Sequence, residues 1–201
     1  MEQSQAKRII EALLCSCDKP LTITQIKEVL EDIDVAQIKS LITELGNEYK
    51  DFGRSFGIQE LAGGYQLSTR PEYAEWLKKF YSKSRKEKLS HPALETIAII
   101  AYRQPITRQE IEDVRGVNVD GVIKTLLERS LIRITGRKEV AGRPFLYGTS
   151  REFLELFGLQ SLQELPKLEE FGELARTSDL EIYKKEEPVQ DVQTNQITQT
   201  D

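Results

Sequence analysis

The side chains best suited to nucleophilic catalysis lie together at one point of the sequence. His91, the one histidine of the chain, directly follows Ser90, and a serine activated by a histidine is a common nucleophile–base pair. The same residues begin a predicted helix, in which Ser90 accepts backbone N–H bonds and Pro92 fits the first turn. We therefore interpret the pair as a helix start. A His91→Ala variant tests the alternative, a hydrolase built around His91.

Glycines and cysteines could point to a phosphate or metal site. However, Gly63-Gly64 and the glycines at positions 136 and 142 do not follow a strand and open a helix, so we interpret them as hairpin turns rather than phosphate loops. Cys15 and Cys17 lie two residues apart on a predicted helix and point away from each other. With one histidine in the chain, a Cys/His zinc site is not expected. The sequence predicts no catalytic residue, metal or cofactor, and hence no enzyme.

The elements around His91 follow a definite order. An apolar helix over residues 94–101 is broken at Pro105, and Thr107 and Glu110 are spaced as a capping box for a second helix. Gly116 ends that helix, and a third is expected from about residue 118 to 129. A β-branched run at 131–135, a turn at 141–144 and a short strand at 145–147 predict a hairpin. Three short helices followed by a hairpin are typical of the winged helix-turn-helix.

The first half of the chain repeats this plan. At a constant shift of 85, the residues of 20–29 match those of 105–114, and Ile38, Leu41 and Ile42 match Ile123, Leu126 and Leu127. After the turns the shift is 80, and the apolar residues of 69–77 match those of 149–157. The predicted fold is mainly α-helical with small β-hairpins (α+β), built from two tandem winged-helix domains.

We expect domains at residues 1–82 and 90–171, a polar linker at 83–89 and a disordered acidic tail at 172–201. The net charge of −5 is unevenly distributed. It is −3 over residues 1–82, +4 over 83–158 and −6 over 159–201. No apolar run approaches the roughly 20 residues that span a bilayer, and residues 1–5 lack the features of a signal peptide. We therefore expect a cytoplasmic protein that does not enter a membrane.

Winged helices often bind DNA, so the predicted third helices were compared with groove-reading helices. The helix of the second domain offers Asp120, Lys124, Thr125, Glu128 and Arg129, a set with two acids that DNA phosphates would repel. The hairpin instead gathers cations, namely Arg133, Arg137, Lys138 and Arg143. We expect at most weak, non-specific DNA contact. A DNA-binding transcription regulator is the alternative, which a comparison of random and specific duplexes at several salt concentrations would test.

Four motifs resemble one protein family. They are HPALET at 91–96, AYRQPITR at 101–108, IEDVRGVNVDGV at 111–122 and GRPFLYGT at 142–149. Together they are similar to bacterial segregation and condensation protein B. The resemblance is specific over about residues 90–170, weaker over 1–82 and absent from the tail. One departure is Ser150, where the family pattern suggests a second threonine, and both residue types can cap a helix.

The resemblance implies a non-enzymatic subunit of the bacterial condensin-like complex. That complex contains a coiled-coil ATPase of the SMC type (structural maintenance of chromosomes) and a kleisin, segregation and condensation protein A. Family members form homodimers through their first domains and bind the kleisin through their second. These properties imply a role in chromosome condensation and partition during cell division, and association with the nucleoid through the complex.

A kleisin-binding surface is expected on the second domain. It would combine the end of the first helix of that domain with the return of the hairpin, because aromatic and arginine side chains on rigid elements often anchor interfaces. The candidate residues are Tyr102, Arg103, Pro105, Ile106, Arg143, Pro144 and Phe145. Tyr102 and Phe145 could instead pack in the core, and the sequence leaves that alternative open.

Overall fold

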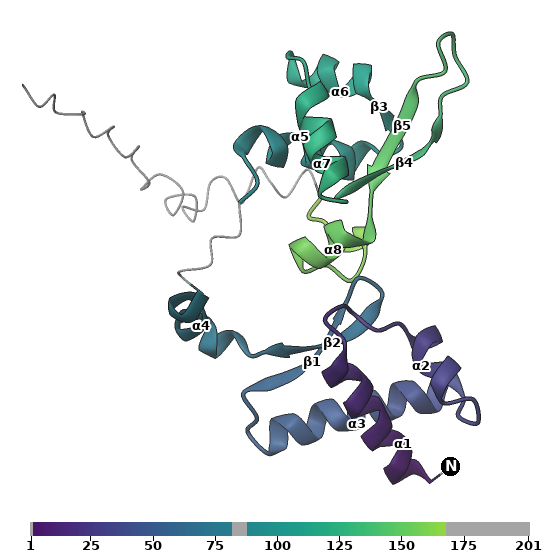
Figure 1. The fold of residues 1–201 in the computed structure, drawn as a ribbon, viewed down its shortest axis with the longest axis vertical. Coiled ribbons are helices and arrows are strands. Elements are labelled where there is room, and N and C mark those ends of the chain that lie inside the picture. The colour runs from purple at the N-terminus through teal and green to yellow at the C-terminus, as the bar shows by residue number, and fades with distance from the viewer. Residues whose placement is uncertain (1, 82–87, 168–201) are drawn as a thin grey trace, which may run out of the picture. The chain divides into compact units, whose positions relative to one another are not determined.

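The computed structural model describes residues 2–81 and 88–167, which form two lobes of the same plan (Figure 1). We refer to residues 2–81 as the N-terminal lobe and to residues 88–167 as the C-terminal lobe. Most of the predicted linker and the whole predicted tail, residues 172–201, lie outside the described residues.

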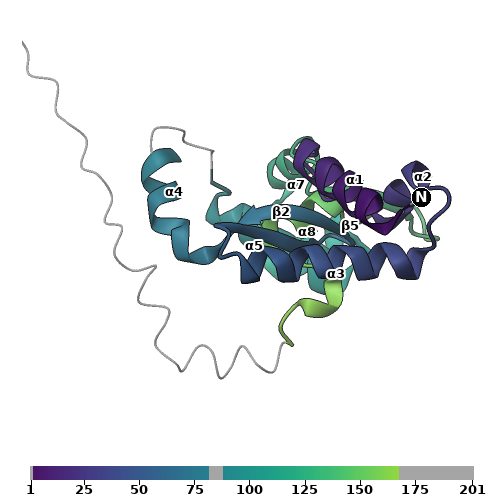
Figure 2. The same cartoon turned by 90° about the horizontal axis from the view of Figure 1, so that it is seen from below.

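The N-terminal lobe has three helices, a β-hairpin and a last short helix. Its elements are α1 (Gln3–Ser16), α2 (Ile23–Val29), α3 (Val35–Asp51), β1 (Phe56–Leu61), β2 (Gly64–Thr69), the 3-10 turn η1 (Pro71–Tyr73) and α4 (Ala74–Tyr81). The hairpin lies over two of the helices, because β1 packs against α3 and β2 against α1 (Figure 2). It is joined to the start of α2 by an isolated bridge between Leu21 and Tyr65.

The core of this lobe follows from helical periodicity. Ala6, Ile10 and Leu14 recur at every fourth position of α1 and are all buried. They meet the buried face of α3, which consists of Ile38, Leu41, Ile42, Leu45 and Tyr49. Between them, Ile26 and Leu30 of the second helical segment are fully buried. The lobe therefore has a continuous apolar core of its own.

The C-terminal lobe repeats the arrangement. Its elements are α5 (His91–Arg103), β3 (Ile106–Thr107), α6 (Arg108–Arg115), α7 (Asp120–Glu128), β4 (Ile132–Arg137), β5 (Phe145–Thr149), α8 (Arg151–Phe157) and the 3-10 turn η2 (Leu162–Glu164). The strands form one antiparallel sheet in the order β3-β5-β4. We call the β4–β5 hairpin the wing. Each lobe has three helices followed by a β-hairpin, which confirms the predicted fold of two tandem winged-helix units.

The predicted helix starts have different outcomes. The capping box of α6 is confirmed, since the Thr107 hydroxyl accepts from the Glu110 N–H and the Glu110 carboxylate accepts from the Thr107 N–H. The same device, with Gln25 in place of glutamate, starts α2 at Thr22. The prediction that the Ser90 side chain caps α5 is wrong. Helix α5 begins at His91, but the Ser90 side chain makes no cap hydrogen bond. Pro92 lies in the first turn of α5, and its fixed φ angle favours the helix even though Ser90 makes no capping bond.

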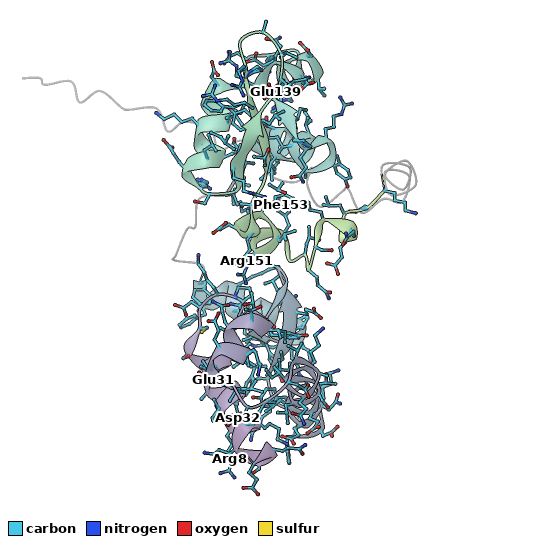
Figure 3. All side chains as sticks on the ribbon, turned by 90° about the vertical axis from the view of Figure 1, so that its right-hand side faces the viewer. Arg8, Glu31, Asp32, Glu139, Arg151 and Phe153 are labelled. Carbon is cyan, nitrogen blue, oxygen red and sulfur yellow. The ribbon has the colours of Figure 1, made fainter. Side chains whose placement is uncertain are left out.

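The two lobes differ most at the helix that follows the hairpin. In α8, Phe153 is 3% exposed and belongs to the core (Figure 3). The equivalent residue in the first repeat, Tyr73, is 38% exposed, and α4 buries none of its residues. None of the helices in the described part of the chain has the length and apolar character needed to cross a bilayer.

A charged contact joins the start of α6 to the wing. The Lys138 ammonium lies 2.6 Å from one Glu110 carboxylate oxygen, and the other oxygen accepts from the Thr107 N–H at 2.9 Å and from its hydroxyl at 2.7 Å. The bond from Lys138 and the two from Thr107 lower the pKa of Glu110 from 4.5 to about 2. The ionised carboxylate is thus favoured in the folded state.

The first prediction concerns this carboxylate. Because its folded pKa is lowered, it stabilises the fold above pH 4.5, and this contribution is lost as the pH falls toward 2. Glu110→Gln should lower the free energy of unfolding near neutral pH by ~1 kcal/mol, the usual value of a helix cap. It should also flatten the pH dependence of that free energy below pH 4.5.

Urea denaturation at a series of pH values measures both effects. Glu128→Gln is the matched control, because Glu128 contacts Lys124 at 3.9 Å on an exposed face of α7. If Glu110→Gln and the parent chain lose stability in parallel on acidification, the carboxylate does not have the proposed role.

Candidate functional site

Gln104 links the end of α5 to the end of the wing through hydrogen bonds. The Gln104 N–H donates to Ile100 O at 2.9 Å and so closes α5. Its side-chain amide donates to Ala101 O at 3.1 Å and lies 3.0 Å from the Thr149 hydroxyl. The Thr149 N–H donates back to Gln104 Oε1 at 2.9 Å. These bonds hold the Gln104–Pro105 segment rigidly beside β5.

This close approach requires glycine at position 148. A Cβ atom there would lie 2.8 Å from Gln104 Oε1 and 2.9 Å from Thr135 Cγ2, which is inside van der Waals contact. Gly148 is buried in β5, next to Thr149, and pairs with Arg133 of β4. The missing side chain therefore lets the end of α5 and strand β4 approach β5 at the same place.

A surface hollow of about 280 Å³ lies at this junction. Gln104 and Pro105 line it from the end of α5, Thr135 from β4 and Leu146 from β5. Phe145, the neighbour of Leu146, is 40% exposed, and the Arg137 guanidinium carbon lies 4.1 Å from the centre of its ring. We call the hollow together with Phe145 and Arg137 the α5–wing corner. Its rigid, part-apolar surface with an aromatic and an arginine suits protein contact.

The structure places the predicted kleisin-binding residues in different surroundings. Pro105 lines the hollow, and Phe145 is the exposed residue next to Leu146 in β5, the strand that borders the hollow. Arg103 is exposed at the end of α5, while Tyr102 and Pro144 are half-buried. Ile106 is 4% exposed and pairs with Tyr147 in β3, so it belongs to the core and does not face a partner.

Arg143 lies at the turn of the wing. Its guanidinium is 3.0 Å from the Glu139 carboxylate, and its carbonyl accepts from Arg137 at 3.1 Å. The prediction omitted Gln104, Thr135 and Leu146, which line the hollow. Gln104 lies within a motif that was recognised, and Gly148 next to Thr149 was the available signal of a close approach.

Many charges that a DNA-binding winged helix would present are used inside the lobe. Asp120, at the start of α7, pairs with Arg108, and this bond lowers the pKa of Asp120 and raises that of Arg108. Among the wing cations, Lys138 binds Glu110, Arg143 binds Glu139, and Arg133 donates to Thr149 O at 3.3 Å. Within the described ranges, no cluster of three or more His, Cys, Asp or Glu side chains suited to a metal occurs. The geometry is that of a tandem winged-helix protein.

The comparisons with known proteins identify the family. The family model for "Segregation and condensation complex subunit ScpB" matches residues 8–168. Segregation and condensation protein B of Syntrophotalea carbinolica is 52% identical over 179 residues, which cover 89% of this chain and 90% of the relative. That of Symbiobacterium thermophilum is 53% identical over 167 residues, covering 83% and 75%. The chain therefore belongs to the segregation and condensation protein B family, as the sequence motifs predicted.

Solved structures of lower overall similarity were also found. The crystal structure of ScpB from Mycobacterium tuberculosis is 33% identical, with a TM-score of 0.39, and covers 79% of this chain and 98% of that one. A dimer of the ScpB N-terminal domain complexed with a ScpA peptide is 37% identical, with a TM-score of 0.36, and covers 38% and 95%.

The second prediction tests the close packing that forms the hollow. Gly148→Ala should lower the free energy of unfolding by about 1–3 kcal/mol, because Gln104 or Thr135 must move to admit the methyl group. Gly136→Ala is the control, since a Cβ at Gly136 meets nothing within 4 Å and its backbone is not left-handed. Equal urea midpoints for the two variants would show that the contact around Gly148 is not tight.

Proposed function

We propose that this protein is a non-enzymatic subunit of the bacterial SMC–kleisin complex, in which a homodimer binds the kleisin, segregation and condensation protein A. Through the kleisin it joins the SMC ATPase, supports chromosome condensation and partition, and is held at the nucleoid within the cytoplasm. The observation that carries the proposal is the family match, which extends over both lobes from residue 8 to residue 168. The ATPase chemistry belongs to the SMC partner.

The α5–wing corner is proposed as part of the kleisin contact. The hollow offers apolar surface from Pro105 and Leu146, and Phe145 adds an exposed aromatic ring held by Arg137. Arg103 and Arg143 are exposed on the same lobe, at the end of α5 and at the turn of the wing. An acidic or amphipathic kleisin segment fits this combination, because exposed arginines beside an aromatic anchor serve both parts of such a segment.

The N-terminal lobe is proposed to form the homodimer. The burial of its apolar side chains supports a proposal for the dimer face. Ile10 and Leu14 are buried, Ile9, Leu13 and Phe56 are half-buried, and Phe52, Trp76 and Phe80 are exposed at 74%, 64% and 77%. Among the described residues, the large apolar side chains that are at least 60% exposed, Phe52, Trp76, Phe80 and Tyr81, all lie in this lobe, and strongly exposed apolar surface often marks an interface. We place the dimer face on α4, with Phe52 as a further candidate.

The third prediction concerns kleisin binding. Arg103→Glu with Arg143→Glu should weaken the affinity for the kleisin middle segment tenfold or more, about 1.4 kcal/mol. Both side chains are exposed, so melting temperature and dimerisation should stay unchanged. Lys39→Glu with Arg54→Glu makes the same charge change on exposed positions of the N-terminal lobe and serves as the control. Unchanged affinity of the folded Arg103/Arg143 variant, measured by titration calorimetry, would remove this surface from the proposal.

The fourth prediction concerns the dimer. Trp76→Asp with Phe80→Asp should convert the full chain to a monomer at micromolar concentration, because two charges cannot be buried unpaired in an apolar interface. The control is Leu156→Asp, at the position in α8 that corresponds to Trp76 and is also exposed, at 56%. Light scattering of the parent chain must first show a dimer. A monomeric parent, or a dimeric Trp76/Phe80 variant, contradicts the proposed face.

A further inference from the structure

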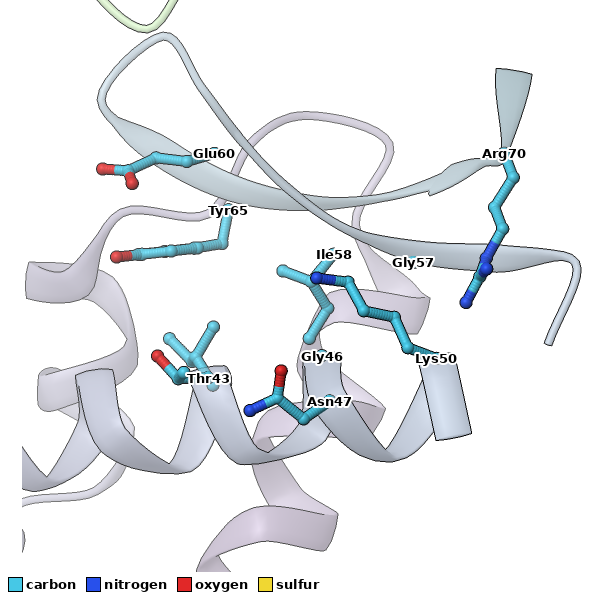
Figure 4. Close-up of a pocket in the computed structure, with 10 residues that line it drawn as sticks. Thr43, Gly46, Asn47, Lys50, Gly57, Ile58, Glu60, Tyr65 and Arg70 are labelled. Carbon is cyan, nitrogen blue, oxygen red and sulfur yellow. The ribbon is translucent and has the colours of Figure 1, made fainter. Parts of the chain in front are cut away.

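A larger hollow lies in the N-terminal lobe, between α3 and the β1–β2 hairpin (Figure 4). It has a volume of about 450 Å³, and Thr43, Gly46, Asn47 and Lys50 line it from α3. These residues are three or four positions apart, so they form one face of the helix. This face carries no large apolar side chain, and it lies beside the buried face of α3 that packs in the core.

Gly46 has no local role in α3. It lies within a 17-residue helix, where glycine is less favourable than other residues. A Cβ atom built at Gly46 meets nothing within 4 Å, and its backbone is not left-handed. Neither a turn nor a close contact within the lobe therefore requires this glycine. A glycine on an open helix face does allow a second helix to approach closely, at the short end of the usual 8–10 Å between helix axes.

Strand β1 is the outer strand of its sheet. Within the described residues, one edge of β2 pairs with β1 and the other is joined to Leu21. The Tyr65 N–H and C=O groups both bond to Leu21, so Tyr65 and the facing Glu60 are not a hydrogen-bonded pair. By alternation, the N–H and C=O groups of Phe56, Ile58 and Glu60 point away from β2. They form an open edge that another strand can extend.

The side chains of the same three residues lie on the α3 side of the sheet. Phe56 and Ile58 pack against the core of the lobe. Glu60, two positions further along β1, lines the hollow together with Ile58. A strand that extends the sheet at this edge therefore lies over the hollow, and every second side chain of that strand points into it.

The hollow has opposite charges at its two ends. Lys50 and Arg70 lie near the start of β1, where the Arg70 N–H donates to Ser55 O at 3.0 Å, and Glu60 lies near its end (Figure 4). Lys50 and Glu60 are both exposed. In an antiparallel pair of β1 strands, the end of one strand lies beside the start of the other. The hollow is therefore complementary in charge to a second copy of itself.

The proposed homodimer also requires more surface than α4 provides. Helix α4 has eight residues, whereas a stable interface involves about 20–30 residues of each partner. A two-fold dimer uses the same surface of both copies, so that surface must be complementary to itself. The β1 edge and its hollow meet this requirement.

We propose that the β1 strands of two copies pair antiparallel about a two-fold axis through Ile58. Ile58 then faces Ile58 of the second copy, and Phe56 faces Glu60 of the second copy, so the outward-pointing groups of both strands form hydrogen bonds. The Glu60 side chain enters the hollow of the other copy beside Lys50. The two α3 helices lie antiparallel under a four-stranded sheet and approach each other at Gly46. This inference rests on the proposed homodimer and adds a second contact to that of α4.

A mixing experiment tests the charge contact. Glu60→Lys and Lys50→Glu should each weaken the dimer of the full-length chain about tenfold, as measured by analytical ultracentrifugation. An equimolar mixture of the two variants should form a heterodimer with the affinity of the parent, because both of its symmetry-related contacts again join opposite charges. Glu28→Lys, at an exposed position of α2, is the control and should leave the dimer unchanged. A mixture that dimerises no better than the single variants contradicts the antiparallel pairing.

A glycine substitution tests the approach of the two α3 helices. Gly46→Gln should weaken the dimer at least tenfold, while circular dichroism shows undiminished helix content, because the new side chain has room within a single chain. The control is Gly121→Gln in α7, where a Cβ atom also meets nothing within 4 Å. An unchanged affinity of the Gly46→Gln dimer would exclude the close approach of the helices and overturn the inference.

Amide hydrogen exchange separates this inference from the homodimer itself. The amides of Phe56, Ile58 and Glu60 should exchange about tenfold more slowly in the dimer than after dilution to the monomer, whereas those of Gly57 and Gln59, which bond to β2, should change little. A dimeric parent with unprotected edge amides overturns the inference and leaves the homodimer standing. A monomeric parent overturns both. Edge protection in the monomer, or only with added kleisin, assigns the edge to another occupant and overturns the inference.

Discussion

In both lobes, the segment that leaves the first helix is paired with the returning strand of the hairpin. In the N-terminal lobe, the Leu21 N–H donates to Tyr65 O at 2.8 Å and the Tyr65 N–H donates to Leu21 O at 2.9 Å. In the C-terminal lobe the same role belongs to β3, where Ile106 pairs with Tyr147. Short helices bury too little surface to be stable alone, so this contact, which closes the hairpin over them, is what allows one core to form.

A glycine lies beside this contact in each lobe: Gly64 admits the backbone of Leu21, and Gly148 admits the side chains of Gln104 and Thr135. A Cβ at Gly64 would lie 2.8 Å from Leu21 O, and a Cβ at Gly148 would lie 2.8 Å from Gln104 Oε1. The threonine that follows the contact, Thr22 or Thr107, then begins the next helix with a capping box. The paired strand, the glycine and the capping threonine are therefore close together in each lobe. In the second lobe, this arrangement forms the α5–wing corner.

The sequence predicted what depends on neighbouring residues. The repeat, the helices, the hairpins and the capping box of Thr107 could all be read from local spacing, because caps and periodicity act within a few residues. Long-range placement could not be read. Ile106 looked like an interface residue but is buried by pairing with Tyr147, and Gln104 lines the hollow because it bonds to Thr149, 45 positions away. Phe153 is buried while its equivalent in the first repeat, Tyr73, is 38% exposed, and only packing decides this difference.

Ion pairs within the C-terminal lobe occupy cations that DNA binding would need. DNA affinity depends on cations that are free to replace counterions along phosphates. Here Arg108 is held by Asp120 at the start of α7, and Lys138 is held by Glu110 at the start of α6. These bonds fix the helices and the wing to each other, so their cations contribute to a rigid surface rather than to a diffuse positive field. A rigid corner with one aromatic ring under an arginine loses little entropy on binding a partner segment, which supports the proposed protein contact.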